Sequence, residues 1–156
     1  MSLEGRRIVD AHHHLWGPDF MGGLAGEYQL AELHADTATV PQVVETVFME
    51  CASSYRTDGP EHLLPVGETE YVADLARASE AADGATITGI VAHADLSLDP
   101  DLLDEVLDAH EAAGGGRFRG IRDALASAPA DVPLSIPGPA APGKAHDPDF
   151  QRGVAR

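Results

Sequence analysis

Three consecutive histidines follow a short apolar stretch near the start of the chain, in the run Ile8-Val9-Asp10-Ala11-His12-His13-His14-Leu15-Trp16. Because side chains alternate across a β-strand, Asp10, His12 and His14 are expected on one face and His13 on the other. Two imidazoles on one face can bind one divalent cation or surround one substrate oxygen. The alternative is a pair of hydrogen-bonded polar residues at a strand end. A loop rich in Gly and Pro follows, and this position favours a functional site.

Strands and helices alternate along the chain, which predicts an α/β fold with a parallel sheet. The expected strands cover residues 7–12, 45–51, 86–93 and 117–122. A long loop is expected up to residue 36, followed by a brief helical turn near Thr39. Helices are expected over residues 68–82 and from Asp99 to the glycines at 114–116, with His110 on the buried stripe of the second. Residues 124–148, rich in Pro, Ala and Gly, are expected to form a long loop.

Four segments resemble one family and occur in the order that its members show: residues 9–16, residues 46–51 with Tyr55 and Arg56, residues 65–70 and residues 116–122. They are similar to the amidohydrolase superfamily, in particular its lactonase-like "amidohydrolase 2" branch. The resemblance implies a (β/α)8 TIM barrel whose site lies at the carboxyl ends of the strands. It also implies a hydrolase in which water attacks the carbonyl of a lactone, a cyclic ester, with an acidic or sugar-derived substrate.

The length of the chain conflicts with a complete barrel. Such a barrel needs roughly 250 residues, and this chain has 156. We therefore expect one domain over residues 1–156 that forms the N-terminal half of a TIM barrel, about four βα units, with residues 1–6 as a leader. Residues 149–156 resemble the opening of a helix. An incomplete chain that lacks its C-terminal half is favoured over a half-barrel that forms a homo-oligomer.

The candidate site residues follow the expected strands, because a barrel builds its site there. His12 and His14 are expected to act in catalysis and to bind a divalent metal, with zinc the first choice, although some relatives in this branch work without a metal. Glu50 is expected to hydrogen-bond a site histidine or to take a proton. Arg122 is expected to hold a substrate carboxylate. The other candidates for substrate binding, from a strand end and a loop, are Tyr55, Arg56 and His93.

Composition excludes several classes of protein. The chain has 10 basic and 26 acidic residues and a formal net charge of −16, which disfavours nucleic acid and anionic membranes as partners and leaves a small-molecule substrate. No run of about eighteen apolar residues occurs, so no transmembrane helix is expected. The single cysteine, Cys51, rules out an internal disulfide framework and indicates a reducing, cytoplasmic location. Cys51 itself is expected to be a small packing residue.

Three alternative functions stay open on the sequence alone. A metal-dependent phosphoesterase can also begin with a His-x-His strand, although the acidic charge does not favour a phosphate substrate. The chain can also be a non-catalytic half-barrel that self-associates or binds a partner, because an open parallel sheet leaves two edges and one face uncovered. The third alternative is a metal-carrier site at His12, His13 and His14. The other metal histidines and the aspartate base that the resemblance implies belong to later strands, which these residues do not reach.

Overall fold

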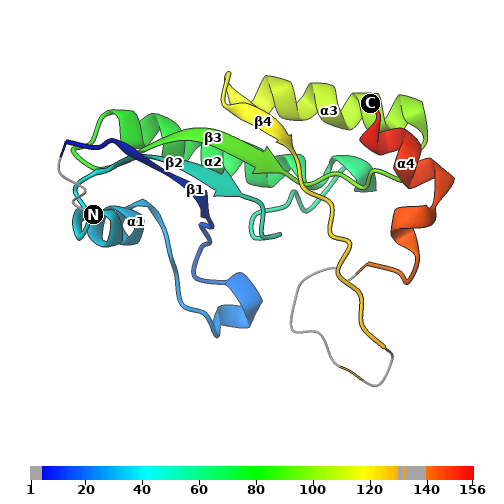
Figure 1. Cartoon of the computed structure of the whole chain (residues 1–156), viewed down its shortest axis with the longest axis horizontal. Helices are drawn as coiled ribbons and strands as arrows, with labels where there is room; N and C mark the ends of the chain where they lie inside the picture. Colours follow the sequence, from blue (N-terminus) through cyan, green and yellow to red (C-terminus); the bar gives the residue numbers. More distant parts are fainter. Residues whose placement is uncertain (1–4, 130–131, 133–139) are drawn as a thin grey trace.

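A four-stranded parallel sheet forms the centre of the protein, with the strands in the order β1-β2-β3-β4 (Figure 1). The computed structural model describes residues 5–129, 132 and 140–156. The strands are β1 (Ile8–His13), β2 (Val43–Met49), β3 (Thr86–Ala92) and β4 (Phe118–Ile121). The predicted α/β class, the four strands and their parallel pairing are therefore confirmed.

Among the described residues, four α-helices accompany the sheet: α1 (Leu30–Ala38), α2 (Val66–Glu80), α3 (Pro100–Gly114) and α4 (Pro148–Val154). The same part of the chain also contains three short 3-10 helices: η1 (Phe20–Gly23), η2 (Glu61–Leu63) and η3 (Lys144–His146). None of the helices within residues 5–129 and 140–156 is long and apolar enough to cross a membrane.

The helices that connect successive strands pack against the same face of the sheet. Phe48 of β2 is fully buried in one cluster with Leu33 of α1 and Val72 of α2. A second cluster joins Leu103 and Val106 of α3 to Ile121 of β4. The opposite face carries Val47, whose methyl groups lie over Gly89 of β3 and are only partly buried. One face of the sheet is therefore the core, and the other has no helix over it among the described residues.

Helix α1 was not expected, and the helical turn predicted near Thr39 is wrong. Thr39 is the C-cap of α1 instead of the start of a helix. The helix begins after Gln29, where a capping box forms: the side chains of Gln29 and Glu32 accept hydrogen bonds from each other's backbone N–H groups. Pro41 lies two residues after the Thr39 C-cap, where proline is common because it cannot continue a helix. The expected long loop to residue 36 is correspondingly shorter.

The two later helices agree with the sequence prediction. Helix α2 covers Val66–Glu80 where residues 68–82 were expected. The side chain of Asp99 caps α3 by accepting a hydrogen bond of 3.0 Å from the backbone N–H of Asp101. Gly115 ends α3 in the left-handed conformation, with φ of 56°, which glycine adopts without steric cost. His110 is fully buried, as its place on the apolar stripe predicted.

A bulge in β1 overturns the expectation that Asp10, His12 and His14 share one face. Asp10 is opposite Thr46 and His13 is opposite Phe48, so three steps along β1 match two along β2. Thr46 and Phe48 are both fully buried beneath the helices. Asp10 and His13 therefore lie on the helix side of the sheet. Simple alternation fails here because the extra residue shifts every later side chain by one position.

The segment after β4 was expected to be a long loop, and much of it lies outside the described residues. From residue 140 onward the chain leads through η3 to α4. Asp147 caps α4 by accepting from the N–H of Asp149 at 2.8 Å, and Pro148 occupies the first turn. This agrees with the predicted helix opening near residue 149.

Candidate active site

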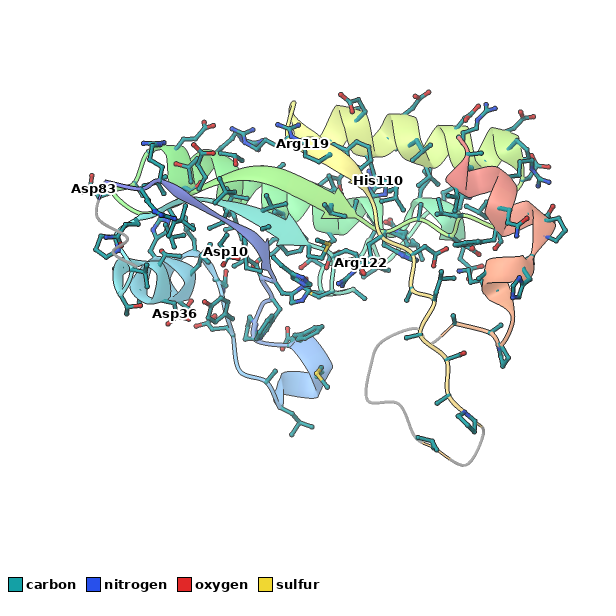
Figure 2. The ribbon with its side chains drawn as sticks, in the orientation of Figure 1. Asp10, Asp36, Asp83, His110, Arg119 and Arg122 are labelled. Atoms are coloured by element: carbon teal, nitrogen blue, oxygen red, sulfur yellow. The ribbon has the colours of Figure 1, made fainter. Side chains whose placement is uncertain are left out.

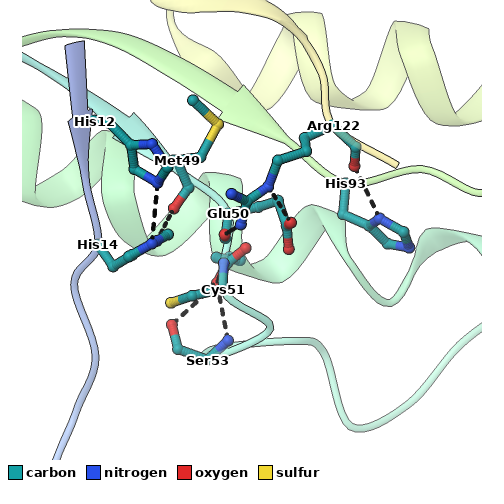
Figure 3. Close-up of polar contacts among 9 residues, drawn as sticks. His12, His14, Met49, Glu50, Cys51, Ser53, His93 and Arg122 are labelled. Carbon is teal, nitrogen blue, oxygen red and sulfur yellow. Dashed lines mark hydrogen bonds and ion pairs between the residues drawn. The ribbon is translucent and has the colours of Figure 1, made fainter. Parts of the chain in front are cut away.

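The imidazoles of His12 and His14 converge at the carboxyl end of β1 (Figure 3). Their Nε2 atoms lie 3.2 Å apart, and the ring planes are nearly perpendicular, at 82°. His14 Nδ1 lies 2.7 Å from the carbonyl oxygen of Met49. Because a carbonyl only accepts, Nδ1 carries the hydrogen and the Nε2 of the neutral ring keeps its lone pair. The pair therefore either shares one proton or directs two lone pairs at one cation.

Glu50 and Arg122 form an ion pair that crosses the end of β3. Arg122 Nε donates to Glu50 Oε1 at 2.7 Å, and Arg122 Nη2 donates to the carbonyl oxygen of Glu50. The Glu50 side chain is 14% exposed and that of Arg122 37% exposed. Strand β2 ends at Met49, so strand alternation does not set the direction of Glu50. Glu50 thus contacts an arginine. One of its two expected roles was a hydrogen bond to a site histidine, and its ion pair is with Arg122 instead.

His93 follows β3 and forms hydrogen bonds with the backbone of Arg122 and with the side chain of His110 on α3. Its Nδ1 lies 3.1 Å from the carbonyl oxygen of Arg122, and its own carbonyl oxygen accepts from His110 Nε2 at 3.0 Å. His93 Nε2 is therefore left as an acceptor in the neutral ring. The ring is nearly parallel to that of Tyr55, with centroids 6.5 Å apart.

Five of the residues predicted from the sequence thus form a row along the carboxyl ends of the four strands (Figure 3). We call these the mouth residues: His12, His14, Glu50, His93 and Arg122. Tyr55 joins them through His93. Arg56 does not, because its guanidinium forms an ion pair with Glu70 on α2.

A cavity of about 590 Å³ opens beside the mouth residues. Tyr55, His93 and Asp95 form its polar wall, with Glu61 and His62 at the η2 side. Its apolar wall comes from Leu64 and Pro65 just before α2, from Leu98 just before α3 and from Leu102 in the first turn of α3. This volume accommodates a small molecule.

Glu68 is a buried carboxyl group that the sequence did not single out. It is 2% exposed and accepts from the N–H groups of Cys51 and Ser53 at 3.2 and 2.8 Å, and from the Ser53 hydroxyl at 3.1 Å. Burial raises the pKa of Glu68, and the hydrogen bonds oppose that rise. Glu68 fixes the loop that leaves β2. An acid in the first turn of a helix is common, so its position carried no signal.

Cys51 lies against this carboxyl group and the carbonyl of Leu15. Burial, followed by the charge of Glu68, raises the pKa of the thiol to about 12. The half-buried thiol packs between these groups, and its raised pKa opposes formation of a thiolate, in agreement with the expected packing role.

The described residues contain no cluster of three or more His, Cys, Asp or Glu side chains that could hold a metal. His12 and His14 form a pair of donors and not a complete set. No protein-family model, curated protein or solved structure matches the chain. A function must therefore be inferred from the geometry of the mouth residues together with the resemblance of the four segments.

Proposed function

We propose that this chain is part of an amidohydrolase-type hydrolase that opens a lactone of an acidic or sugar-derived substrate. The observation that carries the proposal is the convergence of His12 and His14, with Nε2 atoms 3.2 Å apart beside the Glu50–Arg122 pair. The order β1-β2-β3-β4 with all connecting helices on one face supports the further proposal that these are four βα units of a TIM barrel.

His12 and His14 fit a divalent metal, with zinc as the first choice. Two nitrogen ligands about 2.0–2.1 Å from a tetrahedral zinc ion are separated by about 3.3 Å, close to the observed 3.2 Å. His14 Nδ1 donates a hydrogen bond to the Met49 carbonyl, and metal-binding histidines usually make such a bond with the ring nitrogen that does not bind the metal. When bound, the ion would polarise the substrate carbonyl and lower the pKa of a water molecule.

This donor pair is only part of a ligand set, because a catalytic zinc site uses about three protein ligands. We propose that the remaining ligand comes from residues that continue the barrel or from a second copy of the chain. Either source would also cover the uncovered sheet face and the outer edges of β1 and β4. Sedimentation of the 156-residue chain distinguishes them, since a stable monomer would exclude the second copy.

Arg122 is proposed to bind a carboxylate of the substrate, with Glu50 as its positioning residue. Two guanidinium nitrogens contact Glu50, through its side chain and its backbone, and these bonds fix the plane of the guanidinium. His93 and Tyr55 line the adjoining cavity and are proposed to contact the rest of the substrate. Arg56 lies outside this arrangement because it pairs with Glu70.

The test measures metal binding and hydrolysis in two separate steps, so that a loss of one can be distinguished from a loss of the other. The chain is titrated with Co²⁺, whose visible absorption reports its ligands, and then assayed with a panel of lactones. His12→Ala and His14→Ala are each expected to abolish the absorption and any hydrolysis. His146→Ala, at an exposed position on η3, is the matched control and should retain both.

The outcomes separate the proposed hydrolase from its alternatives. Metal binding without hydrolysis would favour a metal-carrier site, provided that hydrolysis is absent both in the 156-residue chain and in the completed barrel. Absence of both would favour a non-catalytic half-barrel. Hydrolysis that survives His12→Ala would contradict the role proposed for the histidine pair.

A further inference from the structure

The cavity beside the mouth residues is lined by two successive βα units. Its lining comes from the segments that follow β2 and β3, residues 55–65 and 93–98, and from Leu102 in the first turn of α3. Helices α2 and α3, which follow these segments, both lie among the described residues. None of the lining residues belongs to the outer strands β1 and β4, so the chemistry of the cavity can be read from this chain.

The cavity adjoins the residue that is proposed to bind the substrate carboxylate. His93, which lines the cavity, has its Nδ1 3.1 Å from the backbone carbonyl oxygen of Arg122. Arg122 lies beyond the carboxyl ends of the strands, whereas Asp83 lies at their amino ends (Figure 2). Tyr55, whose ring is nearly parallel to that of His93, continues the wall. A molecule whose carboxylate is bound by Arg122 can therefore extend past His93 and Tyr55 into the cavity.

Four apolar side chains line the cavity, namely Leu64, Pro65, Leu98 and Leu102. Leu102 is 39% exposed, although the next residue, Leu103, is buried in the core. Apolar groups that cover this wall strengthen binding by about two- to four-fold per methylene group. The hydroxyl groups of a sugar find no hydrogen-bond partners on it and lose their bonds to water.

The charged side chains that line the cavity are acidic. Asp95 and Glu61 belong to the lining, and no Lys or Arg does among the described residues. His62 also lines the cavity, but its Nε2 lies 2.9 Å from the carboxylate of Glu105 on α3. The lining therefore holds two carboxylates and no permanent positive charge.

Asp95 is ionised at neutral pH. Burial opposes the ionised form, but the N–H of Ser97 and the charge of Lys144 hold the pKa of Asp95 below its ordinary value. Asp95 shares Lys144 with Asp123, whose carboxylate is closer to Nζ, at 2.7 Å against 3.5 Å. Two carboxylates on one ammonium leave a net negative charge, which repels a second carboxylate on a ligand.

We propose that the substrate is a lactone with one carboxylate and an apolar substituent, in which Arg122 binds the carboxylate and the cavity holds the apolar group. This inference rests on the proposed function for the lactone and for the role of Arg122, and it adds the chemistry of the rest of the substrate. Between acidic and sugar-derived lactones it selects the acidic ones, and among these it excludes lactones with a second carboxylate.

Binding of acids of equal length tests this preference without any turnover. The 156-residue chain is titrated in a calorimeter with hexanoate, adipate and gluconate, six-carbon acids that share one carboxylate and differ in the remainder. We expect hexanoate to bind about ten-fold more tightly than adipate or gluconate. Butanoate, which is shorter by two methylene groups, should bind about four- to sixteen-fold more weakly than hexanoate.

Two variants test the apolar and the acidic wall separately. Leu102→Gln should weaken hexanoate binding about three-fold and leave adipate unchanged. Leu125→Gln is its control, because Leu125 is 48% exposed and does not line the cavity. Asp95→Asn keeps an oxygen that can accept from the N–H of Ser97, and it should strengthen adipate binding about three-fold without affecting hexanoate. Asp83→Asn, an exposed position far from the cavity, is the matching control.

A third variant tests where the shared carboxylate binds. Arg122→Gln should weaken hexanoate, adipate and gluconate by a similar factor of about ten. Circular dichroism shows whether this variant is folded. The comparison of the acids in the unmodified chain, and the Leu102 and Asp95 variants, test the cavity independently of it.

Four results would overturn the inference. They are adipate or gluconate binding as tightly as hexanoate, no gain in affinity from butanoate to hexanoate, unchanged hexanoate affinity in Leu102→Gln or in folded Arg122→Gln, or no saturable binding of hexanoate in the millimolar range.

The lactone panel separates a failure of this inference from a failure of the proposed function. If hexanoate is preferred as expected and no lactone is opened, the proposed hydrolysis is contradicted and the preference of the cavity stands. If lactones are opened but those with several hydroxyl groups or a second carboxylate react fastest, the hydrolysis stands and this inference is wrong.

Discussion

Arg122 and Glu50 are 72 positions apart in the sequence, and their side chains meet over the end of β3, with Arg122 Nε 2.7 Å from Glu50 Oε1. The pair ties the end of β4 to the end of β2. Loss of this pair should therefore lower the stability of the fold, and this effect can be measured without knowing the substrate.

Replacing Arg122 by alanine should lower the free energy of unfolding by about 1–2 kcal/mol, because the largely buried Glu50 carboxylate loses a charged donor. Urea unfolding followed by circular dichroism measures this. Arg7→Ala is the matched control, since Arg7 pairs with Glu45 but is 74% exposed, and should cost less than about 0.5 kcal/mol. Equal costs in the two variants would show that the Glu50 pair is no stronger than a surface ion pair.

Glu68 should be replaceable by glutamine but not by alanine. Its hydrogen bonds all reach Oε1, which a glutamine retains, and burial raises the pKa so that little is gained from the charge. We expect Glu68→Gln to change stability by less than about 1 kcal/mol and Glu68→Ala to cost about 2–4 kcal/mol. The same urea experiment measures both. A large loss in Glu68→Gln would mean that the ionised form is required.

His110 should make the protein less stable in mild acid. It lies between the Thr69 hydroxyl and the His93 carbonyl, and burial lowers its pKa below the ordinary value of 6.5. Below about pH 6.5 this histidine therefore takes up a proton in the unfolded chain more readily than in the folded chain. The free energy of unfolding consequently decreases as the pH is lowered. His110→Gln should lose less stability than the unmodified chain between about pH 7 and pH 5.

Urea unfolding at both pH values measures this difference, and His146→Gln at an exposed position is the control. If His110→Gln shows the same loss as the unmodified chain, protonation of His110 does not contribute to it.

Lys144 should react slowly with amine-acylating reagents. It is the single lysine of the chain, its Nζ lies 2.7 Å from the Asp123 carboxylate, and its side chain is 18% exposed. Asp123→Asn should speed its acylation several-fold, because the ion pair with Asp123 holds the amine against the protein and covers it. Mass spectrometry measures the rate, with the N-terminal amine as internal reference. Asp149→Asn, which removes only an exposed pair with Arg152, should leave the rate unchanged.

The sequence by itself determined the local elements of this protein. The four strands, the order of strands and helices, the Asp99 cap of α3 and the glycine that ends it all follow from signals within a few residues. The candidate residues at strand ends could also be found in this way, because nearby residues indicate where each strand ends. The capping box of α1, formed by Gln29 and Glu32 three residues apart, is also a local signal.

Only the tertiary structure decided how these elements face one another. The bulge that separates Asp10 from His12 arises from pairing with β2, and a periodic pattern contains no trace of it. The partners of Glu50, Arg56 and Glu68 depend on segments 14 to 72 positions away. Such contacts depend on register and packing between distant segments, which no local periodicity encodes. The pairing of His12 with His14 lies between the two cases, since their spacing brings them close and the Met49 carbonyl fixes the ring of His14.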